Sequence, residues 1–367
     1  MALPPPFPTK SVTPGFVPAG ALEKALRDKL AKSKFSGDFA HMGIALADLT
    51  SIAEDPTPSG SFSVPLGSNA LVDSEVAVGS LSKIHCMFAA YFLKEQVTKA
   101  AAGVGGQASD VQDLIAKITA DWGTTVRNKI AKTPHDFPDL AHIFQFNPKT
   151  PWEPDFRNDF KSWQDLDDKH DKGRAVIDTL EFMDRMKLMV RFSDNMASGS
   201  CVRDIGFQYL NGALAAHGFA DNAKNGVLWL GGDFGYDDSK SPIMGAPPWD
   251  KNADATWVRA NARGIASYLT LVWTNRLVSQ DASQDMRDIL RDRSVGYATY
   301  IGNATPNRLR TFSKIGLLGH IISEGVIIEA KNGATAIRYA AVGLRANRSA
   351  VMKELATIFY DVIASLH

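Results

Sequence analysis

Residues 76–93 read VAVGSLSKIHCMFAAYFL, and this stretch decides how the rest of the chain is interpreted. Gly79 and Ser80 lie where a strand or loop gives way to a helix, and residues 84–93 carry no formal charge. We therefore expect a central, largely buried helix, with Ser80 and Lys83 on one face of its first turn. A partly desolvated lysine at this point is suited to accept the proton of the serine hydroxyl, and a helix N-terminus points backbone N–H groups at a developing oxyanion.

Two further motifs follow this pair along the chain. The sequence FSDN stands at residues 192–195, after an amphipathic segment over residues 176–191, and TFSKIG at residues 311–316 ends a predicted strand. A Ser-x-x-Lys match alone arises about once by chance in a chain of this length, and an N-cap serine followed by a solvated lysine would explain it. The three motifs in this order and in these structural contexts are the signature of class A β-lactamases and penicillin-binding proteins.

The chain therefore resembles the superfamily of serine β-lactamases and penicillin-binding proteins (DD-peptidases), and its motifs are closest to those of class A β-lactamases. The resemblance implies that Ser80 is the acylated nucleophile and that Lys83 is its proton acceptor or relay. It implies that Ser193 passes a proton to the leaving group and that Asn195 contacts the substrate amide and Lys83. Lys314 would supply positive charge beside Ser193.

The same resemblance assigns an oxyanion hole and a substrate-binding strand. The backbone N–H groups of Ser80 and Leu317 would form the oxyanion hole, and Ile315 and Gly316 would face the substrate. Ile315 stands where relatives have a hydroxyl that binds a substrate carboxylate, and Glu324 stands about where they often carry a basic residue for the same carboxylate. We therefore expect neutral esters or amides to be handled better than carboxylate-bearing β-lactams.

A second departure from class A concerns hydrolysis of the acyl-enzyme. Class A β-lactamases use a loop glutamate to activate the deacylating water, but no glutamate occurs between Glu181 and Glu324. The corresponding loop, roughly residues 225–257, offers only aspartates such as Asp233, Asp237 and Asp238. We expect bulky β-lactam adducts to be long-lived and small acyl groups to turn over.

Several functions remain open at this point. The first is a serine hydrolase that forms a Ser80 acyl-enzyme with a small-molecule amide, ester or β-lactam, and thus a β-lactamase, a peptidase or amidase, or an esterase. The second is a weakly catalytic or non-catalytic binding protein that senses a ligand through slow acylation. A scaffold without any acylation is the third, and the full set of motif residues argues against it.

Strand patterns occur near both ends of the chain, at residues 40–49, 61–66, 308–314, 325–329 and 334–342, with mostly helical patterns between them. They predict an α/β (α+β) fold of the β-lactamase/transpeptidase type, with an antiparallel sheet flanked by terminal helices and an all-helical lobe. We expect a proline-rich tail (1–20), a sheet domain (21–78 and 300–367) and a helical domain (79–299). Residues 103–173 form an insertion relative to compact class A enzymes, suited either to a flap over a cleft or to a surface excursion.

Composition excludes several classes of protein. Forty Lys and Arg balance forty Asp and Glu, which argues against a nucleic-acid partner. No stretch reaches the ~20 apolar residues of a membrane helix, and neither a metal site nor a cofactor motif is evident. Cys86 and Cys201 are expected to be buried free thiols rather than a bridge. The chain would be cytoplasmic if its N-terminus is native, and periplasmic or secreted if a leader was removed; its oligomeric state is open.

Overall fold

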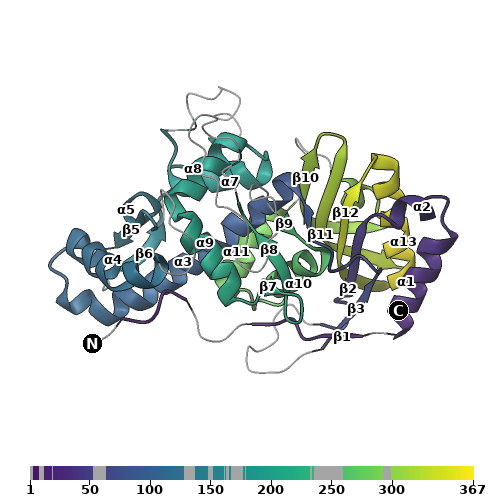
Figure 1. Cartoon of the computed structure of the whole chain (residues 1–367), viewed down its shortest axis with the longest axis horizontal. Helices are drawn as coiled ribbons and strands as arrows, with labels where there is room; N and C mark the ends of the chain where they lie inside the picture. Colours follow the sequence, from purple (N-terminus) through teal and green to yellow (C-terminus); the bar gives the residue numbers. More distant parts are fainter. Residues whose placement is uncertain are drawn as a thin grey trace. The chain divides into compact units, whose positions relative to one another are not determined.

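The structure is a computed structural model. It describes residues 3–7, 12–18, 20–52, 63–127, 137–147, 152–160, 162, 165–166, 177, 179–231, 234, 259–291 and 299–367. The chain divides into two compact units (Figure 1). We call them the helical unit, which comprises residues 1–11, 83–216 and 230–257, and the sheet unit, which comprises residues 12–82, 217–229 and 258–367.

These boundaries differ from the expected ones in two places. Residues 217–229 and 259–291 group with the sheet rather than with the helices, so the helical unit is smaller than the domain expected over residues 79–299. The described residues near the N-terminus pack against other parts of the chain, because Phe7 is only 5% exposed and residues 16–18 form a strand. In both cases burial of apolar surface against a distant part of the chain decides the outcome.

The sheet unit is built on one six-stranded sheet in which strands from both ends of the chain pair. Its strand order is β1-β3-β2-β12-β11-β10, and all neighbours are antiparallel except β1 and β3. The strands are β1 (Phe16–Pro18), β2 (Gly43–Asp48), β3 (Val64–Ser68), β10 (Arg308–Leu318), β11 (Ile321–Asn332) and β12 (Thr335–Ala346). The predicted fold class is confirmed.

Helices cover both faces of this sheet. The terminal helices α1 (Gly20–Lys32) and α13 (Ser349–Ala364) pack against each other on one face, where Leu26 and Leu355 belong to a core cluster that includes side chains of β2, β11 and β12 (Figure 1). Helix α10 (Ala262–Trp273) lies on the opposite face. The remaining elements of the unit are α2 (Ser36–Phe39), η1 (Gly79–Ser82), α11 (Gln280–Leu290), α12 (Tyr300–Ala304) and a small sheet of β4 (Val76–Ala77), β9 (Arg259–Ala260), β8 (Gly226–Trp229) and β7 (Ala220–Asp221).

The helical unit surrounds α3 (Lys83–Val104), the central buried helix that the sequence predicts. Helix α3 contacts α4, α7, α8, α9 and β6, and its charge-free part is buried on all sides. The elements around it are α4 (Val111–Arg127), α5 (Leu140–Ile143), β5 (Phe144–Asn147), β6 (Glu153–Phe156), α7 (Phe182–Arg191), α8 (Asn195–Ile205) and α9 (Phe207–Ala216), with η2 (Gly105–Gln107) after α3.

Several side chains of the insertion over residues 103–173 belong to the core of this unit. The Phe156 ring is 4% exposed and packs on Tyr91 of α3 at 5.2 Å and on Phe182 of α7 at 5.8 Å between ring centroids. Trp122 of α4 is fully buried. Phe156 and Trp122 therefore contribute to the core of the helical unit. No helix in the described chain is long and apolar enough to cross a membrane.

Candidate active site

One group of predicted site residues surrounds the buried amine of Lys83 at the start of α3, in the helical unit. The side chain is fully buried, and its Nζ donates hydrogen bonds to the backbone carbonyl of Ser193, to Asn195 Oδ1 at 2.8 Å and, at 3.5 Å, to Ser193 Oγ. The amine also lies 5.1 Å from the centre of the Phe234 ring. A buried amine is stable only when such acceptors replace water, so Ser193 and Asn195 hold it in one position.

A tight turn between α7 and α8 directs the Ser193-Asp194-Asn195 segment at this amine. The Asp194 side chain caps α8 by accepting a hydrogen bond from the Ala197 N–H at 2.8 Å. Ser193 lies between the two helices with φ of +58°, the left-handed region that non-glycine residues rarely adopt. That conformation carries roughly 1–3 kcal/mol of strain, which the surrounding contacts hold in place.

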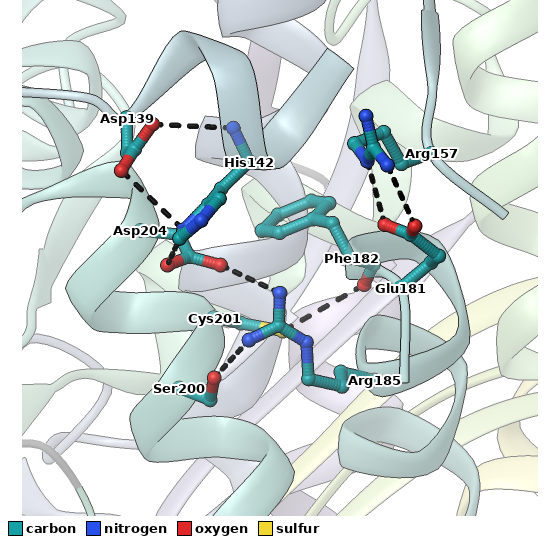
Figure 2. A network of polar contacts seen from close by, with 9 residues as sticks. All are labelled: Asp139, His142, Arg157, Glu181, Phe182, Arg185, Ser200, Cys201 and Asp204. Carbon is teal, nitrogen blue, oxygen red and sulfur yellow. Dashed lines mark hydrogen bonds and ion pairs between the residues drawn. The ribbon is translucent and has the colours of Figure 1, made fainter. Parts of the chain in front are cut away.

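Behind the turn, polar contacts join α7 to α8 and to the neighbouring α5 (Figure 2). Arg185 of α7 donates to Ser200 Oγ and, at 2.7 Å, to Asp204 Oδ2 of α8. Asp204 also lies 3.9 Å from the exposed imidazole of His142, which follows the helix cap Asp139. Burial raises the pKa of Asp204 while Arg185 lowers it, and burial is the larger effect. The pair fixes the helix hairpin at the end opposite Ser193, and sequence motifs alone gave no signal for it.

Cys201 lies in the same network, with its Sγ 3.9 Å from the Phe182 carbonyl oxygen (Figure 2). Both Cys86 and Cys201 are free and buried, which confirms the expectation of two unbridged thiols. Burial raises the pKa of Cys201 to about 12, so this thiol stays protonated and unreactive.

A second group of predicted site residues lies in the sheet unit, where η1 meets β10. A Cβ atom at Gly79 would lie 2.7 Å from the Leu317 carbonyl oxygen and 3.2 Å from the Leu317 nitrogen, and one at Gly316 would lie 1.9 Å from the Val78 carbonyl oxygen. Only glycine allows these two backbones to approach so closely. The backbone of Leu317 therefore lies against Gly79, the residue that precedes Ser80.

The two serines of the Ser-x-x-Lys segment differ in their environment. Ser82 is fully buried, and its hydroxyl donates to the Gly79 carbonyl oxygen at 2.7 Å, which closes the η1 turn. Ser80 is half-buried in the same turn. A hydroxyl that already donates to a backbone carbonyl is less available as a nucleophile. Of the two serines, Ser80 therefore has the more available hydroxyl.

Lys314 and Ile315 lie on β10, at the edge of the six-stranded sheet. Lys314 is 4% exposed, and burial lowers its pKa to about 7. Ile315 is 8% exposed and faces Glu324 of β11 in the strand register.

Glu324 has partners that the sequence analysis did not anticipate. Its fully buried carboxylate accepts hydrogen bonds from the Thr299 hydroxyl and, at 2.9 Å each, from the N–H groups of Tyr300 and Ile301. Glu324 therefore caps the N-terminus of α12, where backbone donors and the helix dipole favour a negative charge. This gives it a structural role that the sequence motifs do not indicate.

The structure thus brings Lys83, Ser193 and Asn195 together in the helical unit, and Gly79, Gly316 and Leu317 together in the sheet unit. Ser80 and Lys314 belong to the sheet unit. The three loop aspartates at residues 233, 237 and 238 lie outside the described residues. No group of three metal-ligating side chains occurs among the residues that the structure describes.

A sequence profile of the β-lactamase enzyme family matches residues 152–363, more than half of the chain. The chain belongs to the β-lactamase enzyme family. The matched range includes the Ser193-Asp194-Asn195 turn and the Lys314-Ile315-Gly316 strand, whereas Ser80 and Lys83 precede it.

Several solved structures match nearly all of the chain at low identity. A β-lactamase from Sphaerobacter thermophilus is 14% identical, with 94% of this chain and 97% of that one covered and a TM-score of 0.48. PBP-A is 13% identical, with 95% and 98% covered, and TLA-3 extended-spectrum β-lactamase is 12% identical, with 95% and 98% covered; both have a TM-score of 0.48. No curated protein matches the sequence.

Proposed function

We propose that this member of the β-lactamase enzyme family is a serine acyl-hydrolase that acts through a Ser80 acyl-enzyme. The observation that carries the proposal is the buried Lys83 amine, held by Ser193 and Asn195, three residues after a half-buried serine. A purely structural lysine has no need of full burial at the first turn of the central helix, because burial of an amine is unfavourable.

The proposed reaction has two steps. The Ser80 hydroxyl attacks the carbonyl carbon of an amide or ester, and its proton passes to Lys83 while the backbone N–H groups of Ser80 and Leu317 stabilise the oxyanion. The carbon–nitrogen or carbon–oxygen bond then breaks, and Ser193 relays the proton from Lys83 to the leaving group. In the second step water attacks the acyl-enzyme ester, which releases the acid and restores the Ser80 hydroxyl.

We propose further that the preferred substrate is uncharged where class A substrates carry a carboxylate. Ile315 offers an apolar side chain beside Lys314 instead of a hydroxyl donor. The Glu324 carboxylate is engaged by α12, so the apolar Ile315 surface, rather than repulsion by Glu324, is the basis of this preference. Ile315→Thr should raise the acylation rate by penicillins about 5- to 150-fold, in line with the ~1–3 kcal/mol of a hydrogen bond to a charged group.

A second candidate function is a ligand sensor that is acylated and deacylates slowly. The absence of any glutamate between residues 181 and 324 favours it, because deacylation needs a base within reach of the attacking water. Time-resolved intact-mass measurement separates the two functions: a hydrolase returns to the unmodified mass within the assay, whereas a sensor keeps one acyl group per chain.

The experiment that tests the acyl-enzyme itself is intact-mass measurement after exposure to penicillins, cephalosporins and activated esters. We expect one acyl group per chain in the wild type and in Ser82→Ala, and none in Ser80→Ala. Ser82→Ala is the matched control because its hydroxyl lies in the same turn but is bound to the Gly79 carbonyl. Equal labelling of Ser80→Ala and the wild type would refute the assignment of the nucleophile.

A further inference from the structure

The N-terminal residues 3–7 lie on a built surface of the helical unit. The indole N–H of Trp122 in α4 donates to the Pro4 carbonyl oxygen at 2.9 Å, and the Tyr209 hydroxyl in α9 donates to the Pro6 carbonyl oxygen at 3.5 Å. Both aromatic side chains are fully buried. Burial raises the pKa of Tyr209 well above its ordinary value, so the hydroxyl remains a donor.

Phe7 enters a slot that exists only because α9 contains a glycine. The ring is 5% exposed and lies 5.4 Å from the Tyr209 ring, centroid to centroid. A Cβ atom at Gly212 would lie 2.6 Å from Cζ of Phe7 and 2.9 Å from its Cε1. Glycine inside a helix is unfavourable by about 1 kcal/mol relative to alanine. Gly212 therefore makes room for the Phe7 ring while it lowers the stability of α9.

The segment has the chemistry of a peptide ligand. Its residues, Leu-Pro-Pro-Pro-Phe at positions 3–7, carry no charged side chain, and consecutive prolines hold an extended helix whose carbonyl groups point outward. Aromatic side chains that donate hydrogen bonds to such carbonyls are a recurring way to bind proline-rich segments. The same features are present here within one chain.

The next described residues attach to the sheet unit. Asn225 donates to the Val12 carbonyl oxygen, and β1 pairs with β3 in the register Phe16 to Val64. Residues 7 and 12 are therefore anchored in different units.

We propose that the helical unit carries a recognition site for a proline-rich segment ending in phenylalanine, and that residues 3–7 of the same chain fill it. Binding of this segment does not depend on the acyl-enzyme chemistry, so the two proposals fail separately.

The test uses the full-length chain and a synthetic peptide of residues 1–10 with a fluorophore at its C-terminus. In the Phe7→Ala chain the chain's own segment is held less tightly, so fluorescence anisotropy should show that this chain binds the peptide at least tenfold more tightly than the wild type, whose own segment occupies the site. A peptide with alanine in place of the phenylalanine should bind at least tenfold more weakly to the Phe7→Ala chain.

Gly212→Ala places a methyl group in the slot. In the Phe7→Ala chain, this substitution should reduce peptide binding at least tenfold. It should not lower the melting temperature, because alanine is more favourable than glycine inside helix α9. Tyr209→Phe, which removes one donor and keeps the ring, should weaken binding less than Gly212→Ala.

Three results would overturn the proposal. The first is equal binding of the peptide to wild-type and Phe7→Ala chains, and the second is peptide binding that Gly212→Ala leaves unchanged. The third is a dimer, seen by analytical ultracentrifugation of the wild type and lost in Phe7→Ala, because the segment would then bind a second copy rather than its own chain.

Discussion

Replacing Lys314 by methionine should change how the stability of the protein depends on pH. The Lys314 amine is almost fully buried in β10, and burial lowers its pKa from 10.5 to about 7. Below pH 7 the amine is protonated in both the folded and the unfolded chain, and folding must bury the charge. At about 1.4 kcal/mol per pKa unit, this burial destabilises the folded protein by about 5 kcal/mol.

The sign of the pH dependence follows from proton counting. Between pH 7 and 10.5 the unfolded chain keeps the proton and the folded chain does not, so the unfolded state binds more protons and stability rises with pH. Above pH 10.5 both states are neutral and the unfavourable contribution disappears. Lys314→Met removes this contribution at every pH, so its advantage over the wild type should shrink by about 1.4 kcal/mol per pH unit across the window.

Urea unfolding of the wild type and Lys314→Met, followed by circular dichroism between pH 6.5 and 10.5, measures this difference. Lys353→Met is the matched control, because Lys353 is exposed on α13 and its variant should give a curve parallel to that of the wild type. A Lys314→Met curve that stays parallel to the wild type would refute the reasoning. In the acylation assay, the proposed charge of Lys314 should be lost as pH rises through about 7, and the rate should fall with it.

Three further predictions concern the turn and the cap. Ser193→Gly should be more stable to urea than Ser193→Ala by about 1 kcal/mol, because the φ of +58° suits glycine, while both lose acylation with the hydroxyl; equal stability would contradict the strain. Asn195→Ala removes the 2.8 Å acceptor of Lys83 and should slow acylation by roughly 100-fold in stopped-flow assays, and an unchanged rate would exclude this role. Glu324→Ala should destabilise the fold by roughly 3 kcal/mol in urea unfolding. Glu324→Gln should destabilise it by less, because glutamine can still accept hydrogen bonds from the first turn of α12; a larger loss of stability for glutamine would contradict the capping role.

The sequence predicts the elements whose signal is local. The charge-free run after Lys83 predicts the buried helix α3, and Asn332-Gly333 predicts the tight hairpin between β11 and β12, where Gly333 has φ of +60°. The Ser193 and Lys314 motifs lie at the helix turn and on the strand where the pattern puts them. These features depend on residues within a few positions of one another.

Features that depend on distant contacts escape the sequence. No residue near Phe7 in the sequence indicates its contacts with Gly212 and Tyr209, about 200 residues away. The sequence alone therefore predicts a proline-rich tail where the structure has a docked segment. The sequence comparison places Glu324 beside the substrate. Its actual hydrogen-bond donors in α12 lie more than twenty residues earlier in the chain, so the sequence does not indicate them. The boundary of the helical unit also depends on distant contacts, because α10 has an ordinary helical pattern but packs on the sheet.

The pairing of β2 with β12 has a consequence for how the protein is made. Gly43 of β2 pairs with Leu344 of β12, so a ribosome must add about 300 residues before β2 meets this partner. At roughly 5–20 residues per second, this interval lasts about 15–60 s. During that time the apolar strand β2, whose six residues are all buried in the finished protein, has an unpaired edge. Synthesis speed and chaperone supply should therefore govern the yield of this protein in a cell more than its final stability does.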